Sequence, residues 1–267
     1  MKRTLFAGVL GALLLCGPAA AAPGADEPNT VHVNAVRNPE IRKYKAILAG
    51  IDTFERHHAL APGVPELRFL VRTASGRTVP APKAPLRVRL EGDDGFILPL
   101  ALGGANLFTV PRDEAALAAN SELALNQKKR DYRIVPWVRT PGLPHNVRRL
   151  GDLRLECKVM MAIGKEEIPL FWVVAINGIL MTRDWCGFFD KQGYAISFTT
   201  ESPVVSAILV EGNRSAALQT SKDSFSIVLN EPSWGDDALV ELSFGEPAGA
   251  DPAVATGTAG ETPRTAP

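Results

Sequence analysis

The segment 183–190 holds the densest group of residues able to bind a ligand. Three aromatic residues flank a cysteine there among charged side chains, and the members are Arg183, Asp184, Trp185, Cys186, Phe188, Phe189 and Asp190. Aromatic rings with a few polar groups are typical of ligand pockets. We therefore take Arg183, Asp184, Trp185, Phe188 and Asp190 as candidate ligand-binding residues, and peptide or carbohydrate binding by this loop as one hypothesis. The pattern equally fits an aromatic cluster packed over a disulfide at the end of a sheet.

The cysteine content favours one structural disulfide. Of the three cysteines, Cys16 lies in a predicted leader segment, which leaves Cys157 and Cys186. Two cysteines in an oxidising compartment most simply pair, and no Cys-x-x-Cys motif suggests redox chemistry. Closing a loop of this size stabilises a fold by roughly 3–4 kcal/mol in the chain-entropy treatment.

Common catalytic motifs are absent from the sequence. It has no Gly-x-Ser-x-Gly, Ser-x-x-Lys or His-Glu-x-x-His motif, no P-loop and no dinucleotide-binding fingerprint. The sequence therefore predicts a non-enzymatic protein without a cofactor. The alternative is a hydrolase of sugar polymers that uses two carboxylates about 5 or 6.5–9.5 Å apart. Its candidate residues are Glu156, Glu166, Glu167, Asp184 and Asp190.

Nor does the sequence predict a metal site. His57 and His58 are adjacent, so on a helix their side chains diverge and do not readily share an ion. The pairs Asp93–Asp94 and Asp236–Asp237 could bind calcium, but such pairs more often form turns, because aspartate bonds to its own backbone.

Charge balance argues against nucleic acid as a partner. The chain has 29 Lys and Arg against 29 Asp and Glu, whereas polyanion binding draws on excess positive charge. A local basic stretch with interleaved Tyr132 and Trp137 is interpreted as a solvated hairpin turn, with a cell-surface polyanion as the alternative. Its basic members are Lys128, Lys129, Arg130, Arg133, Arg139, Arg148 and Arg149.

Both ends of the chain are predicted to lie outside the folded body. Residues 1–21 resemble a secretory leader: Lys2 and Arg3 precede a short apolar stretch, which ends in a small-residue site at 19–21. This predicts a periplasmic or secreted bacterial protein with no membrane span in the mature chain. Residues 246–267 are rich in Ala, Gly, Pro and Thr, a composition typical of disorder.

Hydrophobic periodicity predicts one helix followed by a first β region. In residues 38–60, an Asn-Pro-Glu start is followed by apolar residues at three- and four-residue spacing, which predicts an amphipathic helix. A first β-sandwich domain is expected over 63–140, after an N-terminal segment at 22–62. Its strands are predicted at 67–71, 86–90, 96–102, 107–110, 122–125 and 132–138, with a helical turn at 113–119.

A Pro/Gly-rich linker at 141–151 separates this region from a second predicted β domain at 152–245. Alternating apolar residues predict a strand over 153–161, and Asn177–Gly178 between apolar runs predicts a hairpin of strands 170–176 and 179–183. Further strands are predicted at 194–200, 204–210, 216–220, 224–229 and 238–244. The expected fold is mainly β, with two antiparallel sandwich-like regions and one N-terminal amphipathic helix.

One part of the first β region is similar to a known family. An apolar strand, Ser75–Gly76, a proline-marked loop, a strand at 86–90, and Gly104 ahead of Phe108-Thr109-Val110-Pro111 follow in that order. Over residues 67–110 this resembles the carboxypeptidase-regulatory-like (prealbumin-like) β-sandwich modules of secreted proteins. The resemblance implies a non-catalytic accessory role. The sequence as a whole predicts an exported protein that binds an envelope protein, a polymer or another ligand.

Overall fold

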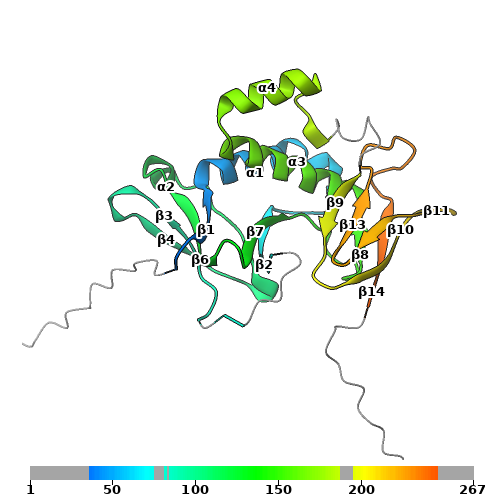
Figure 1. The fold of residues 1–267 in the computed structure, drawn as a ribbon, viewed down its shortest axis with the longest axis horizontal. Coiled ribbons are helices and arrows are strands. Elements are labelled where there is room, and N and C mark those ends of the chain that lie inside the picture. Colours follow the sequence, from blue (N-terminus) through cyan, green and yellow to red (C-terminus); the bar gives the residue numbers. More distant parts are fainter. Residues whose placement is uncertain (1–35, 75–80, 83, 187–194, 246–267) are drawn as a thin grey trace, which may run out of the picture. The chain divides into compact units, whose positions relative to one another are not determined.

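We analysed a computed structural model, which describes residues 36–74, 81–82, 84–186 and 195–245. Within these ranges the fold is mainly β, with 14 strands in four antiparallel sheets (Figure 1). This confirms the predicted fold class; sandwich packing of the sheets stays a prediction. The predicted leader (1–21) and the predicted C-terminal tail (246–267) lie outside the described residues. No described helix is long and apolar enough to cross a bilayer.

The first part of the chain forms two sheets. Their strands are β1 (Pro39–Lys43), β2 (Arg68–Thr73), β3 (Val88–Glu91), β4 (Ile97–Leu100), β5 (Leu107–Phe108), β6 (Glu122–Lys128) and β7 (Tyr132–Trp137). The strand orders are β1-β6-β3-β4 and β5-β2-β7. Strands β2 to β7 confirm the six strands predicted here. The predicted helical turn is α2 (Glu114–Ala118), capped by the Asp113 carboxylate, which accepts from the Ala116 N–H at 2.7 Å.

The second part forms two more sheets. Their strands are β8 (Val147–Arg149), β9 (Ile196–Thr199), β10 (Val204–Glu211), β11 (Arg214–Ala217), β12 (Gln219–Ser221), β13 (Ser224–Ile227) and β14 (Leu239–Phe244). The orders are β11-β10-β14-β8 and β12-β13-β9. Strands β9, β10, β13 and β14 confirm four of the five strands predicted here, whereas the strand predicted at 216–220 is divided between β11 and β12, which lie in different sheets. Strand β8 lies inside the predicted linker and pairs with β14, so part of that linker belongs to a sheet.

The predicted helix at 38–60 begins later than expected. Residues 39–43 form β1, which pairs with β6, and Asn38 has a left-handed φ of 58° instead of capping a helix. The helix α1 spans Tyr44–Arg56, followed by the 3-10 turn η1 (His58–Leu60). Pairing with β6 satisfies the hydrogen-bonding groups of the β1 backbone. This long-range contact outweighs the local helix-start signal of Asn-Pro-Glu. Two other 3-10 turns are η2 (Asp93–Gly95) and η3 (Gly104–Asn106).

The strand predicted at 153–161 is wrong, because this segment is the centre of helix α3 (Leu150–Glu167). The helix lies between two hydrophobic clusters and buries a stripe in each. Leu153 and Cys157 belong to one cluster, whereas Leu155, Val159 and Ile163 belong to the other. Two interleaved helical stripes place an apolar residue at every second position, which imitates the alternation of a strand.

The predicted hairpin at 170–183 is also wrong. Residues 170–180 form helix α4 (Leu170–Leu180), and Met181 ends it in the left-handed region at φ 50°. A segment in which nearly every residue is apolar shows no period, so Asn177–Gly178 is its strongest local signal. Asn177 instead accepts a hydrogen bond from the Trp185 Nε1–H at 2.9 Å, which links α4 to the segment after it.

The two hydrophobic clusters divide the described chain at α3. The first joins α1, α2, strands of the first two sheets and one side of α3, and the second joins the last two sheets to the other side of α3. In Figure 1, α1 and α3 run side by side, and α4 lies above them at the top of the view. Gly50 of α1 allows α1 and α3 to approach closely, because a Cβ added there would lie 2.8 Å from Ile163 Cγ1.

Candidate functional site

A groove of about 440 Å³ lies between α1, α3 and the segment that follows α4. Its walls come from the C-terminal half of α1, the exposed side of α3 and residues 183–185. We call it the α1–α3 groove, and its lining residues are Ala49, Thr53, Arg56, His57, Lys158, Met161, Ala162, Lys165, Glu166, Arg183, Asp184 and Trp185.

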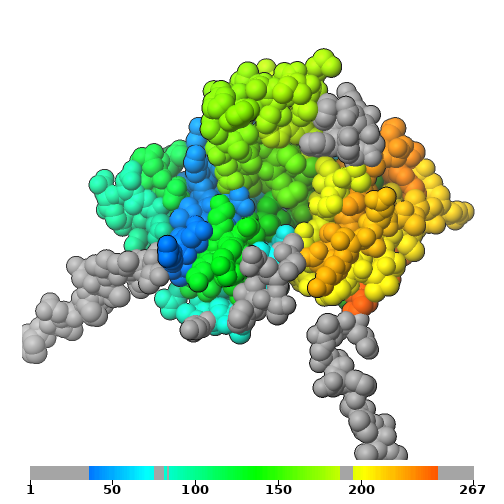
Figure 2. Space-filling model, in the orientation of Figure 1, coloured from blue at the N-terminus to red at the C-terminus, as the bar shows by residue number. Residues whose placement is uncertain are grey.

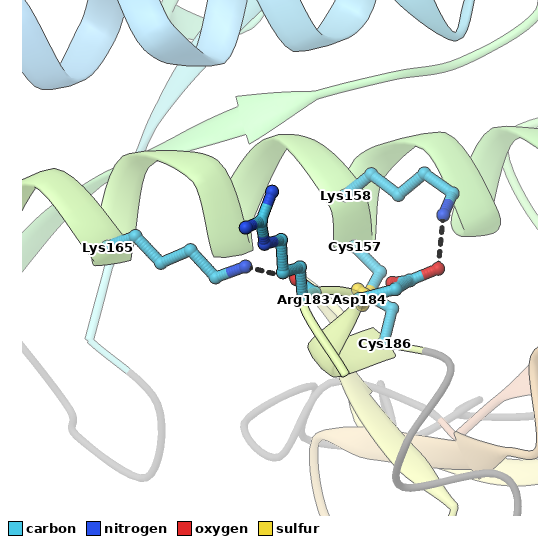
Figure 3. The surroundings of a disulfide bond; sticks show 6 residues. All are labelled: Cys157, Lys158, Lys165, Arg183, Asp184 and Cys186. Carbon is cyan, nitrogen blue, oxygen red and sulfur yellow. Dashed lines mark hydrogen bonds and ion pairs between the residues drawn. A yellow bond between two sulfur atoms is a disulfide. The ribbon is translucent and has the colours of Figure 1, made fainter. Parts of the chain in front are cut away.

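A disulfide joins one wall of the groove to another. Cys157 of α3 is bonded to Cys186, which confirms the predicted pair, and their Cα atoms lie 6.2 Å apart. Both sulfurs belong to the second hydrophobic cluster and are shielded from solvent. Figure 3 shows the bond beneath the side chains of Lys158 and Asp184. The cross-link therefore holds residues 183–185 against α3.

Lysines of α3 make the polar contacts across this junction. The Lys158 Nζ donates to Asp184 Oδ2 at 2.7 Å, and the Lys165 Nζ donates to the Arg183 carbonyl at 2.5 Å (Figure 3). The Lys165 Nζ also lies 4.7 Å from the centroid of the Trp185 ring, at cation–π distance. One face of this indole is therefore engaged by Lys165, and its N–H is engaged by Asn177.

Positive charge exceeds negative charge along the groove. Four cationic side chains line it, together with one histidine and two carboxylates; the cations are those of Arg56, Lys158, Lys165 and Arg183. Burial lowers the pKa of Lys165, with the charge of Lys158 acting in the same direction and that of Asp184 opposing it. Burial, Lys158 and Arg56 likewise lower the pKa of His57. Adding a negative charge here would relieve this repulsion.

The predicted site residues divide between the groove and the undescribed segment. Arg183, Asp184 and Trp185 line the groove, whereas Phe188 and Asp190 lie outside the described residues. The sequence did not identify Lys158 and Lys165 as site residues. Their seven-residue spacing places them on one face of a helix, but the strand predicted there concealed this relationship.

Two of the four described hydrolase candidates, Glu156 and Glu167, lie outside the α1–α3 groove. Glu156 is buried and accepts from Arg148 Nη2 at 2.9 Å, and Glu167 pairs with Arg42 at 2.7 Å. Of the four described candidates, Glu166 and Asp184 line the same groove. Glu166 lies 3.4 Å from the Lys45 Nζ, and Asp184 is paired with Lys158. Both carboxylates of the groove therefore already have a lysine partner within the chain.

Four of the residues considered for metal binding have other partners. His58 Nε2 lies 2.7 Å from the Val64 carbonyl, and Asp93 accepts from Asn120 at 2.9 Å. Asp236 pairs with Arg154, and Asp237 pairs with Arg149. In the part of the chain that the structure describes, no three His, Cys, Asp or Glu side chains gather as a metal site would require.

The basic stretch near residue 129 is a turn, although not the hairpin that was predicted. It joins β6 to β7, which lie in different sheets. Trp137 at the end of β7 has Arg139 and Arg148 guanidinium carbons 5.5 and 5.6 Å from its ring centroid. These arginines therefore belong to the internal packing, and the groove is the stronger candidate for ligand binding.

Comparison with protein families, with curated proteins and with solved structures finds no match to this chain. The resemblance of residues 67–110 to carboxypeptidase-regulatory-like modules stays a prediction. The candidate function therefore depends on the chemistry of the groove.

Proposed function

We propose that this chain is an exported binding protein whose α1–α3 groove takes a small organic anion with a carboxylate or phosphate group. The observation that supports this proposal most strongly is the excess of cationic side chains around a groove of about 440 Å³. This volume falls within the range of small-molecule pockets. The proposal assigns no reaction to the groove.

Groups suited to anion binding stand on different walls. Arg56 on α1 and Arg183 after α4 are exposed, so their guanidinium groups have room to meet a ligand. Guanidinium forks bind carboxylate and phosphate through two parallel hydrogen bonds. Lys158 keeps 22 % of its side chain exposed beside Asp184, so an entering anion would share its charge with that carboxylate.

Polar acceptors in the groove would add selectivity. Glu166, Asp184 and the nearly buried Thr53 offer oxygens that can accept from ligand hydroxyl or amine groups. A ligand that has hydroxyl groups next to its anionic group would use both kinds of contact. A hydroxylated carboxylic acid therefore suits the groove better than an unsubstituted fatty acid, for which the charged walls would be desolvated without compensation.

Export is supported by the leader-like residues 1–21 and by the disulfide. Shielded disulfides persist in oxidising compartments such as the periplasm, and are rare in the cytosol. The proposal places the protein in the bacterial envelope or outside it. Recovering the chain from a bacterial periplasmic extract, with its first residue near position 22 by mass spectrometry, would test this part.

Isothermal titration calorimetry with citrate, succinate and inorganic phosphate tests the binding proposal. We expect citrate, the hydroxylated tricarboxylate, to bind most tightly. The double variant Arg56→Gln/Arg183→Gln should weaken citrate binding at least about tenfold, since two charge-assisted contacts are removed. The matched control is Lys129→Gln, which removes an exposed cation at the β6–β7 turn and should leave the affinity unchanged.

Binding that is equally affected by both variants would contradict the assignment of the site. Absence of heat with all three anions, in protein whose fold is confirmed by circular dichroism, would contradict the proposed ligand class. The hydrolase alternative makes a different prediction: release of reducing sugar from a polymer, abolished by Glu166→Gln or Asp184→Asn.

A further inference from the structure

His57 is the one histidine among the described residues that line the α1–α3 groove. It lies at the C-terminal end of α1, where its backbone N–H donates to the Thr53 carbonyl at 3.1 Å. The imidazole is half-buried, and within the described residues it has no hydrogen-bond partner. The imidazole of His58 differs, because its Nε2 lies 2.7 Å from the Val64 carbonyl. Both ring nitrogens of His57 are therefore free to contact a molecule in the groove.

Charged groups from three elements face this imidazole. Arg56 precedes it on α1, Lys158 faces it from α3, and Asp184 faces it from the segment after α4. Lys158 and Asp184 are themselves paired at 2.7 Å between Nζ and Oδ2, so their charges partly cancel (Figure 3). The other charged side chains of the groove are those of Lys165, Glu166 and Arg183. With four Lys and Arg against two carboxylates, a proton on His57 adds to an existing excess of positive charge.

The groove that holds His57 is open to solvent. Figure 2 shows the surface of α3 and α4, in green and yellow-green, along the top of the molecule. The groove lies beside α3, and Arg56, Arg183 and Asp184 are exposed on its walls. Protons and small solutes can therefore enter the groove without a change of fold.

The charge of His57 depends on what the groove contains. Burial and the charges of Lys158 and Arg56 lower its pKa below the ordinary value of about 6.5, and Asp184 opposes them. An anion beside the ring acts in the opposite direction, because an opposite charge within about 4–6 Å raises the pKa of a histidine by about 1–3. The empty groove therefore favours the neutral imidazole, whereas the occupied groove favours the imidazolium.

We infer that His57 is a ligand-binding residue that takes up a proton together with the anion, so that the affinity of the groove rises as the pH falls from about 8 to about 5.5. This inference rests on the proposed anion-binding function. The proton comes from solvent and binds a ring nitrogen, and the resulting imidazolium N–H donates to the carboxylate or phosphate.

The ordinary titration ranges of the side chains assign this dependence to the imidazole. Histidine is the only side chain with an ordinary pKa between about 5 and 8, whereas lysine and arginine are charged throughout this range. A ligand that favours the protonated state must bind more tightly when more of that state is present. The groove thus binds its anion at mildly acidic pH and releases it as the pH rises.

Isothermal titration calorimetry with tartrate, between about pH 5.5 and about pH 8, tests the inference on the chain as it is recovered from the exporting cell. Tartrate is a hydroxylated dicarboxylate that stays ionised over this range, so the ligand contributes almost no pH dependence of its own. We expect an affinity at least about fivefold higher at the acidic end. Titrations in two buffers of different ionisation enthalpy should show uptake of up to about one proton for each tartrate bound.

Two substitutions separate the charge of His57 from its shape. His57→Gln has no titratable group, so its affinity for tartrate should stay within about twofold over the whole pH range. His57→Lys is charged at every pH tested and should bind tartrate at about pH 8 at least about fivefold more tightly than His57→Gln. The matched control His145→Gln removes an exposed histidine that stacks on Phe244 outside the groove, and should keep the pH dependence of the parent chain.

The ring resonances of the histidines in proton NMR provide a second measurement. Saturating tartrate should raise the pKa of His57 by at least about 1. The ring resonances of His145 should not respond to tartrate, because this residue does not line the groove. Circular dichroism of each variant confirms its fold.

Two outcomes would overturn the inference and leave anion binding intact. One is a tartrate affinity of the parent chain that does not change with pH. The other is a pH dependence that His57→Gln retains, because another group must then take up the proton. Absence of tartrate binding at every pH, in the parent chain and in all variants, would instead contradict the anion-binding function and this inference with it.

Discussion

Leu153 and Leu155 of α3 are separated by one residue, yet they are buried in different hydrophobic clusters. Each side chain is 0 % exposed, Leu153 among the last two sheets and Leu155 between α1 and the first two sheets. The same helix therefore supplies part of the core on both of its sides. Neither half of the described chain completes its core without α3.

We expect this sharing to make unfolding a single cooperative transition. Leu153→Ala and Leu155→Ala should each lower the free energy of unfolding by about 2–5 kcal/mol through a cavity in a closely packed core. Each variant should also lower the denaturant midpoint of the whole described fold, because both hydrophobic clusters unfold together. Chemical denaturation followed by far-ultraviolet circular dichroism and by tryptophan fluorescence checks this; two separated transitions, with only one shifted by each variant, would refute it.

Two glycines of α3 provide a matched comparison. A Cβ at Gly151 would lie 2.1 Å from the Leu60 carbonyl oxygen, whereas one at Gly164 would meet nothing within 4 Å. Gly151→Ala should therefore destabilise the fold by roughly 1–3 kcal/mol, because backbone must move. Gly164→Ala should stabilise it by up to about 1 kcal/mol, since alanine favours a helix. Equal melting temperatures for the two variants would show that α3 does not pack closely against η1.

The buried pair Arg148 and Glu156 should tolerate joint replacement better than loss of the cation. Arg148 Nη2 donates to Glu156 and to the Val138 carbonyl, and burial raises the pKa of Glu156 while Arg148 opposes this. Arg148→Ala should cost about 3–5 kcal/mol of unfolding free energy, because a buried carboxylate is left without its partner. The double variant Arg148→Met/Glu156→Leu should recover most of that loss. Urea denaturation measures both; a double variant no more stable than Arg148→Ala would disprove this explanation.

His57 gives the fold a pH dependence of predictable sign. Its pKa in the folded chain is lowered below the ordinary value of about 6.5, so the unfolded chain takes up a proton first as the pH falls. His57 therefore favours the unfolded state increasingly as the pH drops from about 6.5 toward its folded pKa. We expect His57→Gln to lose less stability than the parent chain over this interval. Thermal melts of both at matched pH values provide the measurement, and identical pH profiles would contradict it.

The disulfide should support both stability and ligand binding. Replacing Cys157 and Cys186 by alanine should cost roughly 3–4 kcal/mol, since the unfolded chain is no longer cross-linked. It should also weaken anion binding, because residues 183–185 would lose their anchor to α3. Calorimetry under conditions where the double variant is still folded separates the loss of stability from the loss of affinity. Unchanged affinity in the double variant would show that the groove is held by other contacts.

The sequence predicted many of the β strands because they bury one face, and the alternation of apolar and polar residues reports this directly. Val88 and Leu90 of β3 are buried and Arg89 is only partly so, as their alternation predicts. The prediction from sequence was wrong at α3 and α4. An argument from periodicity assumes that an element buries one face, and neither helix does so. Leu153 and Leu155 satisfy two cores, and α4 is apolar all round. In both segments, long-range packing decides the conformation.

Only the part of the candidate site that is local in sequence was predicted. Arg183, Asp184 and Trp185 stood out as a local cluster, and all three line the groove. Lys158 and Lys165 reach them only because α3 is a helix and Cys186 is cross-linked to it. A spacing of seven residues indicates a shared face only after the helix is recognised.

Nitrogen–proton correlation NMR during a citrate titration tests the anion-binding groove most directly. The Trp185 Nε1–H resonance and the backbone amides of residues 53–57, 158–166 and 183–185 should shift progressively and saturate, with those of β10 and β11 unmoved. Saturating shifts centred on the β6–β7 turn, or no saturating shift in the groove at millimolar citrate, would contradict the proposal that this groove binds a small organic anion.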